Sequence, residues 1–71
     1  METVGNRIRY LRRKNFETQQ VLADAIGASY HMISFWENGR HKVPSWAVRA
    51  ICHRYKVSAD WLLGIGEANE R

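Results

Sequence analysis

The chain has 71 residues, 45% of them hydrophobic, and a formal net charge of +4 at pH 7. Its length predicts one small domain, residues 1–71, whose hydrophobic core is only just large enough for a stable fold. The single cysteine, Cys52, excludes an internal disulfide, and three separated histidines match no metal-ligand spacing, so we expect helix packing to supply the stability, helped by dimerisation.

The apolar residues recur with helical spacing throughout, and no window alternates with a period of two for long enough to predict a strand. Each of the predicted helices begins at a threonine, serine or proline suited to a first turn. The five predicted helices span residues 3–14, 18–26, 29–38, 44–56 and 58–63. The sequence therefore predicts an all-α fold, a compact five-helix bundle with its core within residues 4–64 and a short tail at 65–71.

Each predicted helix has residues assigned to the interior. Spacings of three, four and seven residues place them on one face of their helix. The residues expected to face the core are Val4, Ile8, Leu11, Leu22, Ala25, Ile26, Ile33, Trp36, Val48, Ile51, Cys52 and Tyr55. In the last helix, Trp61 and Leu62 are candidates for closing the core.

The segment LADAIGASYHMISFWENG joins the second and third predicted helices tightly. Ala23 is small, as required where two steeply crossing helices touch. Gly27 tolerates the positive φ that a three-residue turn needs. Ile33 is a branched apolar anchor that faces back toward the first of the two helices. These residue types at these spacings describe a helix-turn-helix.

The positive charge brackets a neutral-to-acidic middle. Residues 1–14 are rich in arginine, residues 15–38 contain neither lysine nor arginine, and residues 40–56 are basic again. A cationic surface of this kind favours a polyanionic partner, most simply nucleic acid.

The sequence resembles the Cro/phage-repressor, or XRE-like, helix-turn-helix family. The matching residues are Thr18-Gln19, Leu22-Ala23, Ile26-Gly27, Ser29, Ile33-Ser34, Trp36-Glu37-Asn38-Gly39, Pro44, Val57-Ser58 and Trp61-Leu62-Leu63. The resemblance extends over nearly the whole chain and implies a lambda-repressor-like DNA-binding domain. Such a domain is expected to be a Cro-like or small repressor that regulates transcription by binding a double-stranded DNA operator in a sequence-specific way.

The resemblance further implies that helix 29–38 enters the major groove. Tyr30, His31, Ser34 and Phe35 match family positions that meet base edges, although the family usually has a polar or basic residue where Phe35 stands. None of the four can make a bidentate Arg–guanine or Gln–adenine contact. We therefore expect modest direct readout, with affinity from phosphate contacts and some specificity from DNA shape.

A second set of residues is expected to contact DNA phosphates: Gln19, Ser29, Asn38, Arg40, His41 and Lys42. We expect Arg7, Arg9 and Arg13 to form a solvated helix face rather than a DNA contact. Glu37 is expected to form a structural ion pair with Arg12, as the family does, rather than serve catalysis or bind a metal.

The chain departs from the family's usual Gly-Leu pair before the Thr-Gln step, where it has Phe16-Glu17. Phe16 is the candidate for the leucine's pocket. Alternatives remain open for the aromatic positions of helix 29–38. Tyr30 can instead pack on the second helix, His31 can be merely solvated, and Phe35 can lie half-buried under the loop at 40–46.

Members of the family usually bind as dimers to half-sites roughly 34–36 Å apart. The resemblance implies a homodimer with contacts near the last helix, and Trp61, Leu63 and Ile65 are the candidates. Without a second domain, an inducer pocket has no obvious place, so no small-molecule ligand is expected.

The alternative function is a protein-interaction module on the same fold. Exposed aromatic residues are preferred at protein interfaces, and Trp46 in the loop and Trp61 near the end are such candidates. An enzyme is not expected, because no catalytic Ser/His/Asp or Cys/His set and no glycine-rich phosphate loop occur. No cofactor, metal or membrane partner is expected. The lone thiol and the lack of a signal-like apolar start predict a cytoplasmic protein.

Overall fold

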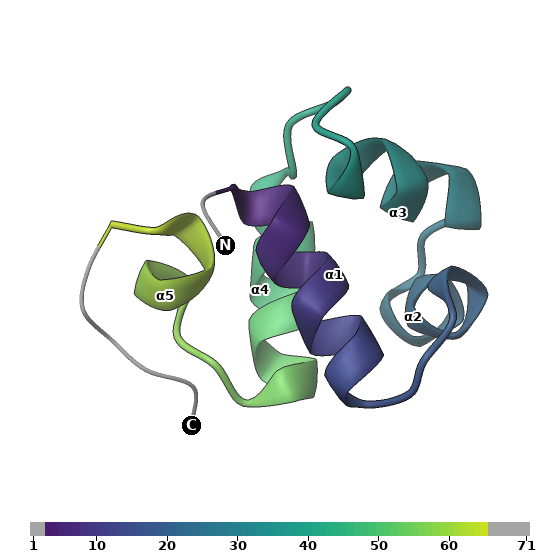
Figure 1. The fold of residues 1–71 in the computed structure, drawn as a ribbon, viewed down its shortest axis with the longest axis horizontal. Coiled ribbons are helices and arrows are strands. Elements are labelled where there is room, and N and C mark those ends of the chain that lie inside the picture. Colours follow the sequence, from purple (N-terminus) through teal and green to yellow (C-terminus); the bar gives the residue numbers. More distant parts are fainter. Residues whose placement is uncertain (1–2, 66–71) are drawn as a thin grey trace.

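The computed structural model describes residues 3–65, so of the predicted tail at 65–71 only Ile65 is described. Five helices form this part of the chain: α1 (Val4–Lys14), α2 (Gln19–Ile26), α3 (Tyr30–Glu37), α4 (Ser45–Tyr55) and α5 (Ala59–Leu63). The helix pair α2–α3 and the short helix α5 lie on opposite sides of α1, and α4 runs behind α1 (Figure 1). Within residues 3–65 no strand occurs, and the predicted all-α fold is confirmed. None of these helices is both long and apolar enough to span a membrane.

Local signals set the helix ends. Four helices begin at a hydroxyl side chain that accepts a hydrogen bond from a backbone amide three residues on. These N-cap residues are Thr3, Thr18, Ser29 and Ser58. Gly27 and Gly64 end α2 and α5 in the left-handed conformation, with φ of 77° and 71°. Pro44 is the N-cap residue of α4, with an extended backbone and no side-chain cap hydrogen bond, and the helix starts at Ser45.

The core lies where α1, α2, α3 and α4 meet and is closed by α5. Its buried apolar residues are Ile8, Leu11, Leu22, Ala23, Ile33, Trp36, Ala47, Ile51, Val57 and Leu62. Full burial of one leucine or isoleucine side chain stabilises the fold by about 1.5–3 kcal/mol. The prediction for Ala25 is wrong: Ala25 is exposed. The buried residues of α2 are Leu22 and Ala23, with Ile26 packed against the core, and Ala25 lies on the other face of the helix.

The end of α3 is pressed against the start of α1. A Cβ atom on Gly5 would lie 2.3 Å from the carbonyl oxygen of Trp36 and 2.7 Å from that of Glu37. Because both neighbours are backbone atoms, no side chain can move aside to make room. Gly5 therefore allows a close approach that sequence analysis missed, although a glycine inside a helical pattern is a known signal of one.

The turn between α1 and α2 also differs from the prediction. Phe16 has φ of 58° and is 96% exposed, so it does not fill an apolar pocket. The chain turns through the left-handed region at this residue, which directs the side chain to solvent. The inward position belongs to Glu17, whose carboxylate accepts hydrogen bonds from Tyr55 Oη at 2.7 Å and from the Arg54 guanidinium. A polar contact with α4 thus takes the place of the expected apolar one.

Candidate nucleic-acid interface

The outer face of α3 carries two pairs of aromatic rings. Tyr30 and His31 are exposed in its first turn, and their ring centroids lie 4.2 Å apart. One turn later, Phe35 meets His41 of the following loop edge-on, with centroids 4.9 Å apart. Phe35 is partly exposed and is covered at one side by that loop residue. The four candidate base-contacting residues, with Ser34 between the ring pairs, therefore share one accessible helix face.

Ser29 is the N-cap residue at the start of α3, beside the exposed face. Ser29 Oγ accepts a hydrogen bond from the amide of Met32 at 3.2 Å. The hydroxyl hydrogen of Ser29 remains a donor beside the helix N-terminus, where backbone amides and the helix dipole favour an anion.

The buried carboxylate of Glu37 lies beneath the exposed face of α3. Glu37 is 3% exposed and accepts hydrogen bonds from Arg12 Nε at 2.8 Å and Arg12 Nη2 at 3.0 Å. Gln19 Nε2 donates to the same carboxylate at 3.2 Å. Burial by itself raises the pKa of Glu37, but the hydrogen bonds from Arg12 and Gln19 outweigh it and hold this pKa below its ordinary value. The expected Arg12–Glu37 pair is present and joins α1 to α3, and Gln19 adds α2 to the cluster.

Arg9 belongs to the same cluster. Its Nε lies 3.3 Å from Glu37 Oε1, and its Nη2 donates to Asn38 Oδ1 at 3.0 Å. The expectation that Arg9 is merely solvated is wrong, because its partners are Glu37 at the end of α3 and the C-cap residue Asn38, 28 and 29 residues away. Its position three residues before Arg12 puts both guanidinium groups on one helix face, which is the sequence signal that could have revealed the shared partner.

Arg7 is also structural. Its Nη1 donates to the carbonyl of Trp61 at 2.7 Å, and its guanidinium lies 5.1 Å from the Trp61 ring centroid. The expectation of a solvated Arg7 is therefore wrong as well, whereas Arg13 is exposed. The Trp61 ring also meets the ring of Tyr10, with centroids 6.1 Å apart. The half-buried Trp61 thus fastens α5 to α1.

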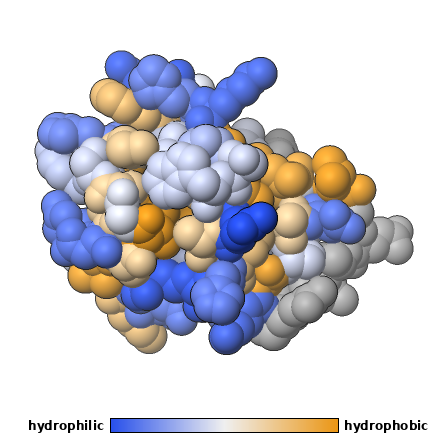
Figure 2. Space-filling model, turned by 180° about the vertical axis from the view of Figure 1, so that it is seen from behind, coloured by the Kyte–Doolittle hydropathy of each residue, from blue (hydrophilic) through white to orange (hydrophobic). Residues whose placement is uncertain are grey.

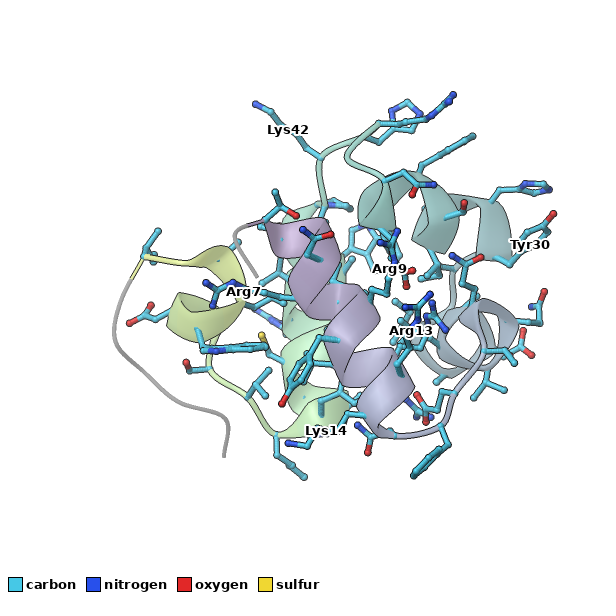
Figure 3. The ribbon with its side chains drawn as sticks, in the orientation of Figure 1. Arg7, Arg9, Arg13, Lys14, Tyr30 and Lys42 are labelled. Atoms are coloured by element: carbon cyan, nitrogen blue, oxygen red, sulfur yellow. The ribbon has the colours of Figure 1, made fainter. Side chains whose placement is uncertain are left out.

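The loop after α3 presents cationic groups to solvent. Gly39 adopts φ of 74°, and the amide of Arg40 donates to the carbonyl of Phe35 at 2.8 Å. Arg40, His41 and Lys42 are all exposed. Figure 3 shows Lys42 projecting from this loop and Tyr30 from the far end of α3. The expected phosphate-contacting residues therefore flank the expected base-contacting residues.

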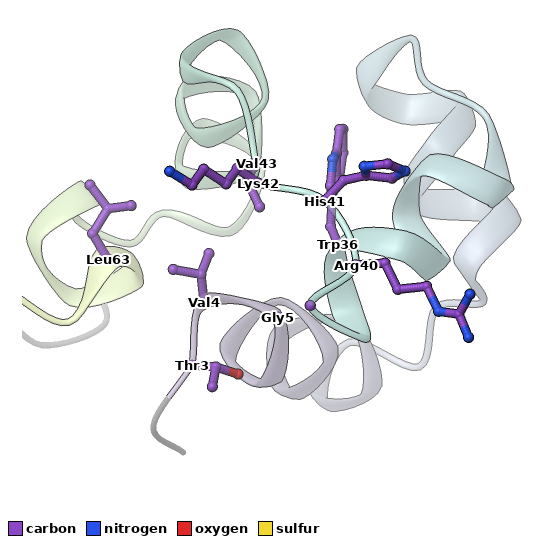
Figure 4. Close-up of a pocket in the computed structure, with 10 residues that line it drawn as sticks. Thr3, Val4, Gly5, Trp36, Arg40, His41, Lys42, Val43 and Leu63 are labelled. Carbon is purple, nitrogen blue, oxygen red and sulfur yellow. The ribbon is translucent and has the colours of Figure 1, made fainter.

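A cavity of about 580 Å³ separates this loop from the start of α1. Val4 and Gly5 line one side, and Lys42 and Val43 line the other (Figure 4). The Arg40 side chain extends away from the hollow. In the part of the chain that the structure describes, no cluster of histidine, cysteine and carboxylate side chains is suited to a metal.

Exposed apolar residues lie at the end of the molecule that α5 forms. Ile65 is 71% exposed and Leu63 is also exposed. Apolar side chains, in orange, gather where α5 lies at the right of Figure 2. A neighbouring groove of about 550 Å³ is lined by Val43, Ser45, Val48, Arg49, Cys52, Ala59 and Leu63. Burial raises the pKa of the Cys52 thiol.

The interpretation of Trp46 as a loop residue is wrong, and Trp46 lies within the helix predicted at 44–56. It occupies the first turn of α4, because the helix begins directly after Pro44. The Trp46 ring remains exposed on one side and meets the Trp36 ring nearly at right angles, with centroids 5.9 Å apart.

Comparisons with known proteins agree with this geometry. A family model described as a helix-turn-helix domain matches residues 3–62. The chain is 34% identical over 61 residues to the HTH-type transcriptional regulator DicA of Escherichia coli (strain K12), which covers 86% of the chain and 45% of DicA. The chain thus spans less than half the length of this relative.

Two solved structures are similar over most of the chain. The P22 c2 repressor in complex with synthetic operator 9T superposes with a TM-score of 0.83 and 30% identity, covering 89% of this chain and 96% of the repressor chain. The clp gene regulator ClgR from C. glutamicum gives a TM-score of 0.75 and 30% identity, covering 86% of this chain and 79% of ClgR.

Proposed function

Because the chain belongs to the Cro/phage-repressor-like helix-turn-helix family, we propose that it is a transcriptional regulator that binds double-stranded DNA in a sequence-specific way. The observation that carries the proposal is the exposed face of α3, held from below by the Glu37 cluster and flanked by cationic loop residues. Similarity to a repressor solved with its operator supports placing α3 in the major groove. The family consists of DNA-binding regulators and not of enzymes, so we assign no catalytic activity.

The base contacts come from Tyr30, His31, Ser34 and Phe35. Phe35 offers only apolar contact, best suited to a thymine methyl group, and His31 can donate to guanine N7 or O6. The two aromatic pairs leave little freedom to these side chains, since each ring lies against a neighbour. Direct readout is therefore modest, and DNA shape supplies part of the specificity.

The phosphate contacts come from Arg40, His41 and Lys42, with further donors from three residues that also bond within the protein. Gln19 and Asn38 each use one amide hydrogen internally and keep the second, and Ser29 keeps its hydroxyl hydrogen. These donors surround the ends of α2 and α3, where a DNA backbone would pass.

We further propose that the protein acts in the cytoplasm as a homodimer on two half-sites. The exposed Leu63 and Ile65, beside the apolar groove of α4 and α5, form the candidate dimer surface. Trp61 contributes less than expected, because Arg7 and Tyr10 already cover it.

The alternative function, a protein-interaction module, is not favoured. Of the aromatic residues invoked for it, Trp61 is half-buried against Tyr10, whereas Trp46 remains 45% exposed. The relatives and structures that resemble the chain favour DNA binding instead.

Charge reversal tests the proposal. The double variant Arg40→Glu/Lys42→Glu should lose DNA binding in fluorescence anisotropy, whereas the matched double variant Arg13→Glu/Lys56→Glu, with the same change in net charge, should bind nearly as wild type. Neutralising each phosphate-contacting cation lowers the slope of log affinity against log salt by roughly one unit. Equal weakening of both double variants would contradict the proposed interface.

A further inference from the structure

A row of three polar side chains runs from α1 to the outer face of α3. Arg9 Nη2 donates to Asn38 Oδ1 at 3.0 Å, and Asn38 Nδ2 donates to Ser34 Oγ at 3.4 Å. Arg9 is anchored at its other end by the buried Glu37 carboxylate, and its side chain is 32% exposed. Ser34 lies one helical turn before Asn38, on the face that also carries Tyr30.

The chemistry of these groups fixes the direction of both hydrogen bonds. A guanidinium group has only donors, so Asn38 must present its amide oxygen to Arg9. The amide nitrogen of Asn38 then faces Ser34. Because an amide nitrogen only donates, Ser34 Oγ accepts, and the hydroxyl hydrogen has to point elsewhere. Among the described residues, Asn38 is the sole hydrogen-bonding partner of the Ser34 hydroxyl.

We propose that Arg9 and Asn38 are positioning residues that set the Ser34 hydroxyl as a hydrogen-bond donor toward the DNA. This inference rests on the proposed function, and it names what one residue of α3 reads. A serine hydroxyl normally both donates and accepts, so it discriminates weakly between bases. Because Asn38 occupies one of its two lone pairs and the hydroxyl hydrogen points away from Asn38, Ser34 is biased toward base edges that offer an acceptor.

The hydrogen-bonding groups of the bases in the major groove then determine which base Ser34 prefers. Guanine offers N7 and O6, adenine offers N7, and thymine offers O4, but cytosine presents only the N4 amino donor. The Ser34 hydroxyl therefore selects against cytosine at the base that it meets. Without the hydrogen bond from Asn38, both lone pairs of Ser34 are free, and the serine accepts from cytosine N4 more readily.

Site selection from random DNA duplexes, followed by sequencing, tests this inference. We expect the wild-type site to disfavour cytosine at one position in each half-site. Ser34→Ala should remove that preference, a change of roughly two- to tenfold, which is the range expected for one hydrogen bond. The other positions of the site should keep their preferences and so serve as an internal control.

Asn38→Asp provides the sharper variant. A carboxylate only accepts, so the Ser34 hydroxyl would turn to donate to residue 38 and present its lone pairs to the DNA. Cytosine should then rise at the affected position, while guanine and thymine fall. The added negative charge weakens binding to all sequences alike and leaves relative preferences intact. Arg9→Met, which releases Asn38, is the second variant and should broaden the preference at the same position.

The outcomes separate the inference from the function on which it rests. An enriched site whose base preferences are the same for wild type, Ser34→Ala and Asn38→Asp would overturn the inference and leave the proposed function standing. A wild-type protein that enriches no site would overturn both. Thermal melting followed by circular dichroism identifies a variant that fails to fold, and Arg9→Met then decides in place of Asn38→Asp.

Discussion

The Arg12 guanidinium holds the Glu37 carboxylate through two parallel hydrogen bonds, Nε to Oε2 at 2.8 Å and Nη2 to Oε1 at 3.0 Å. The Glu37 side chain is fully buried. The remaining guanidinium nitrogen of Arg12 donates to the carbonyl of Glu17 at 2.8 Å. One arginine therefore fixes α3 and the start of α2 relative to α1, and the orientation of the proposed recognition helix depends on it.

Removing the charge of Glu37 should destabilise the protein strongly. Glu37→Gln leaves the buried Arg12 without its counter-ion, and breaking a buried pair in this way costs about 3–5 kcal/mol. Urea denaturation measures the free energy of unfolding. The control is Glu17→Gln, which removes a carboxylate whose partner Arg54 is partly exposed. This control should lose less free energy of unfolding than Glu37→Gln. An equal loss in both variants would show that the burial of Glu37 has no special role.

Acid should destabilise the protein through the same carboxylates. The hydrogen bonds of Glu37 and Glu17 outweigh their burial, so the pKa of each lies below the ordinary value of 4.5. The unfolded chain therefore takes up protons before the folded chain does, and acidification favours unfolding. The stabilisation should be complete above about pH 4.5 and decline as the pH falls further. Urea midpoints over this range measure the decline, and Glu37→Gln should flatten it.

Gly5→Ala should destabilise the fold although alanine is the better helix former. The helix propensity gain is about 1 kcal/mol. The new methyl group would meet two backbone oxygens closer than 3 Å, and overpacking of this kind costs about 1–3 kcal/mol or more. A thermal melt should therefore show a lower Tm for Gly5→Ala. A raised Tm would mean that α1 and α3 can separate at little cost.

Phe16→Gly should stabilise the protein. Phe16 has a left-handed backbone conformation that costs a residue with a Cβ about 1–2 kcal/mol, and its exposed ring contributes little packing. Glycine relieves this strain but adds freedom to the unfolded chain, so we expect a net gain of about 0.5–1 kcal/mol. Phe16→Ala, which removes the ring and keeps the strain, is the matched control. Equal gains from both variants would locate the effect in the ring instead.

Helix ends could be predicted from sequence because their causes are local. The hydroxyl of Thr3 caps the turn that follows it, and Gly27 ends α2 at the conformation that glycine tolerates best. The helix-turn-helix spacing of Ala23, Gly27 and Ile33 is similarly contained within one short segment. Each of these features is determined by neighbours along the chain.

The residues that were predicted wrongly are placed by contacts with residues distant in the sequence or by the local backbone conformation. Arg7 meets Trp61 across 54 residues, and Arg9 meets Asn38 across 29, so the periodicity of α1 alone suggested a solvated face. The prediction for Phe16 rested on its place beside the Thr-Gln step, where the family has a Gly-Leu pair, whereas the left-handed backbone at the turn determines where its side chain lies. The role of Gly5 became visible only when the carbonyl groups at the end of α3 were in place.

Binding of the wild-type protein to a pool of random DNA duplexes across a salt series, followed by sequencing of the retained duplexes, tests most directly whether the protein reads DNA sequence. We expect affinity to fall steeply with salt and a two-fold-symmetric site to be enriched, with half-sites roughly 34–36 Å apart. Steep salt dependence without enrichment would contradict sequence-specific recognition by α3. Absence of binding even at low salt would contradict DNA binding itself.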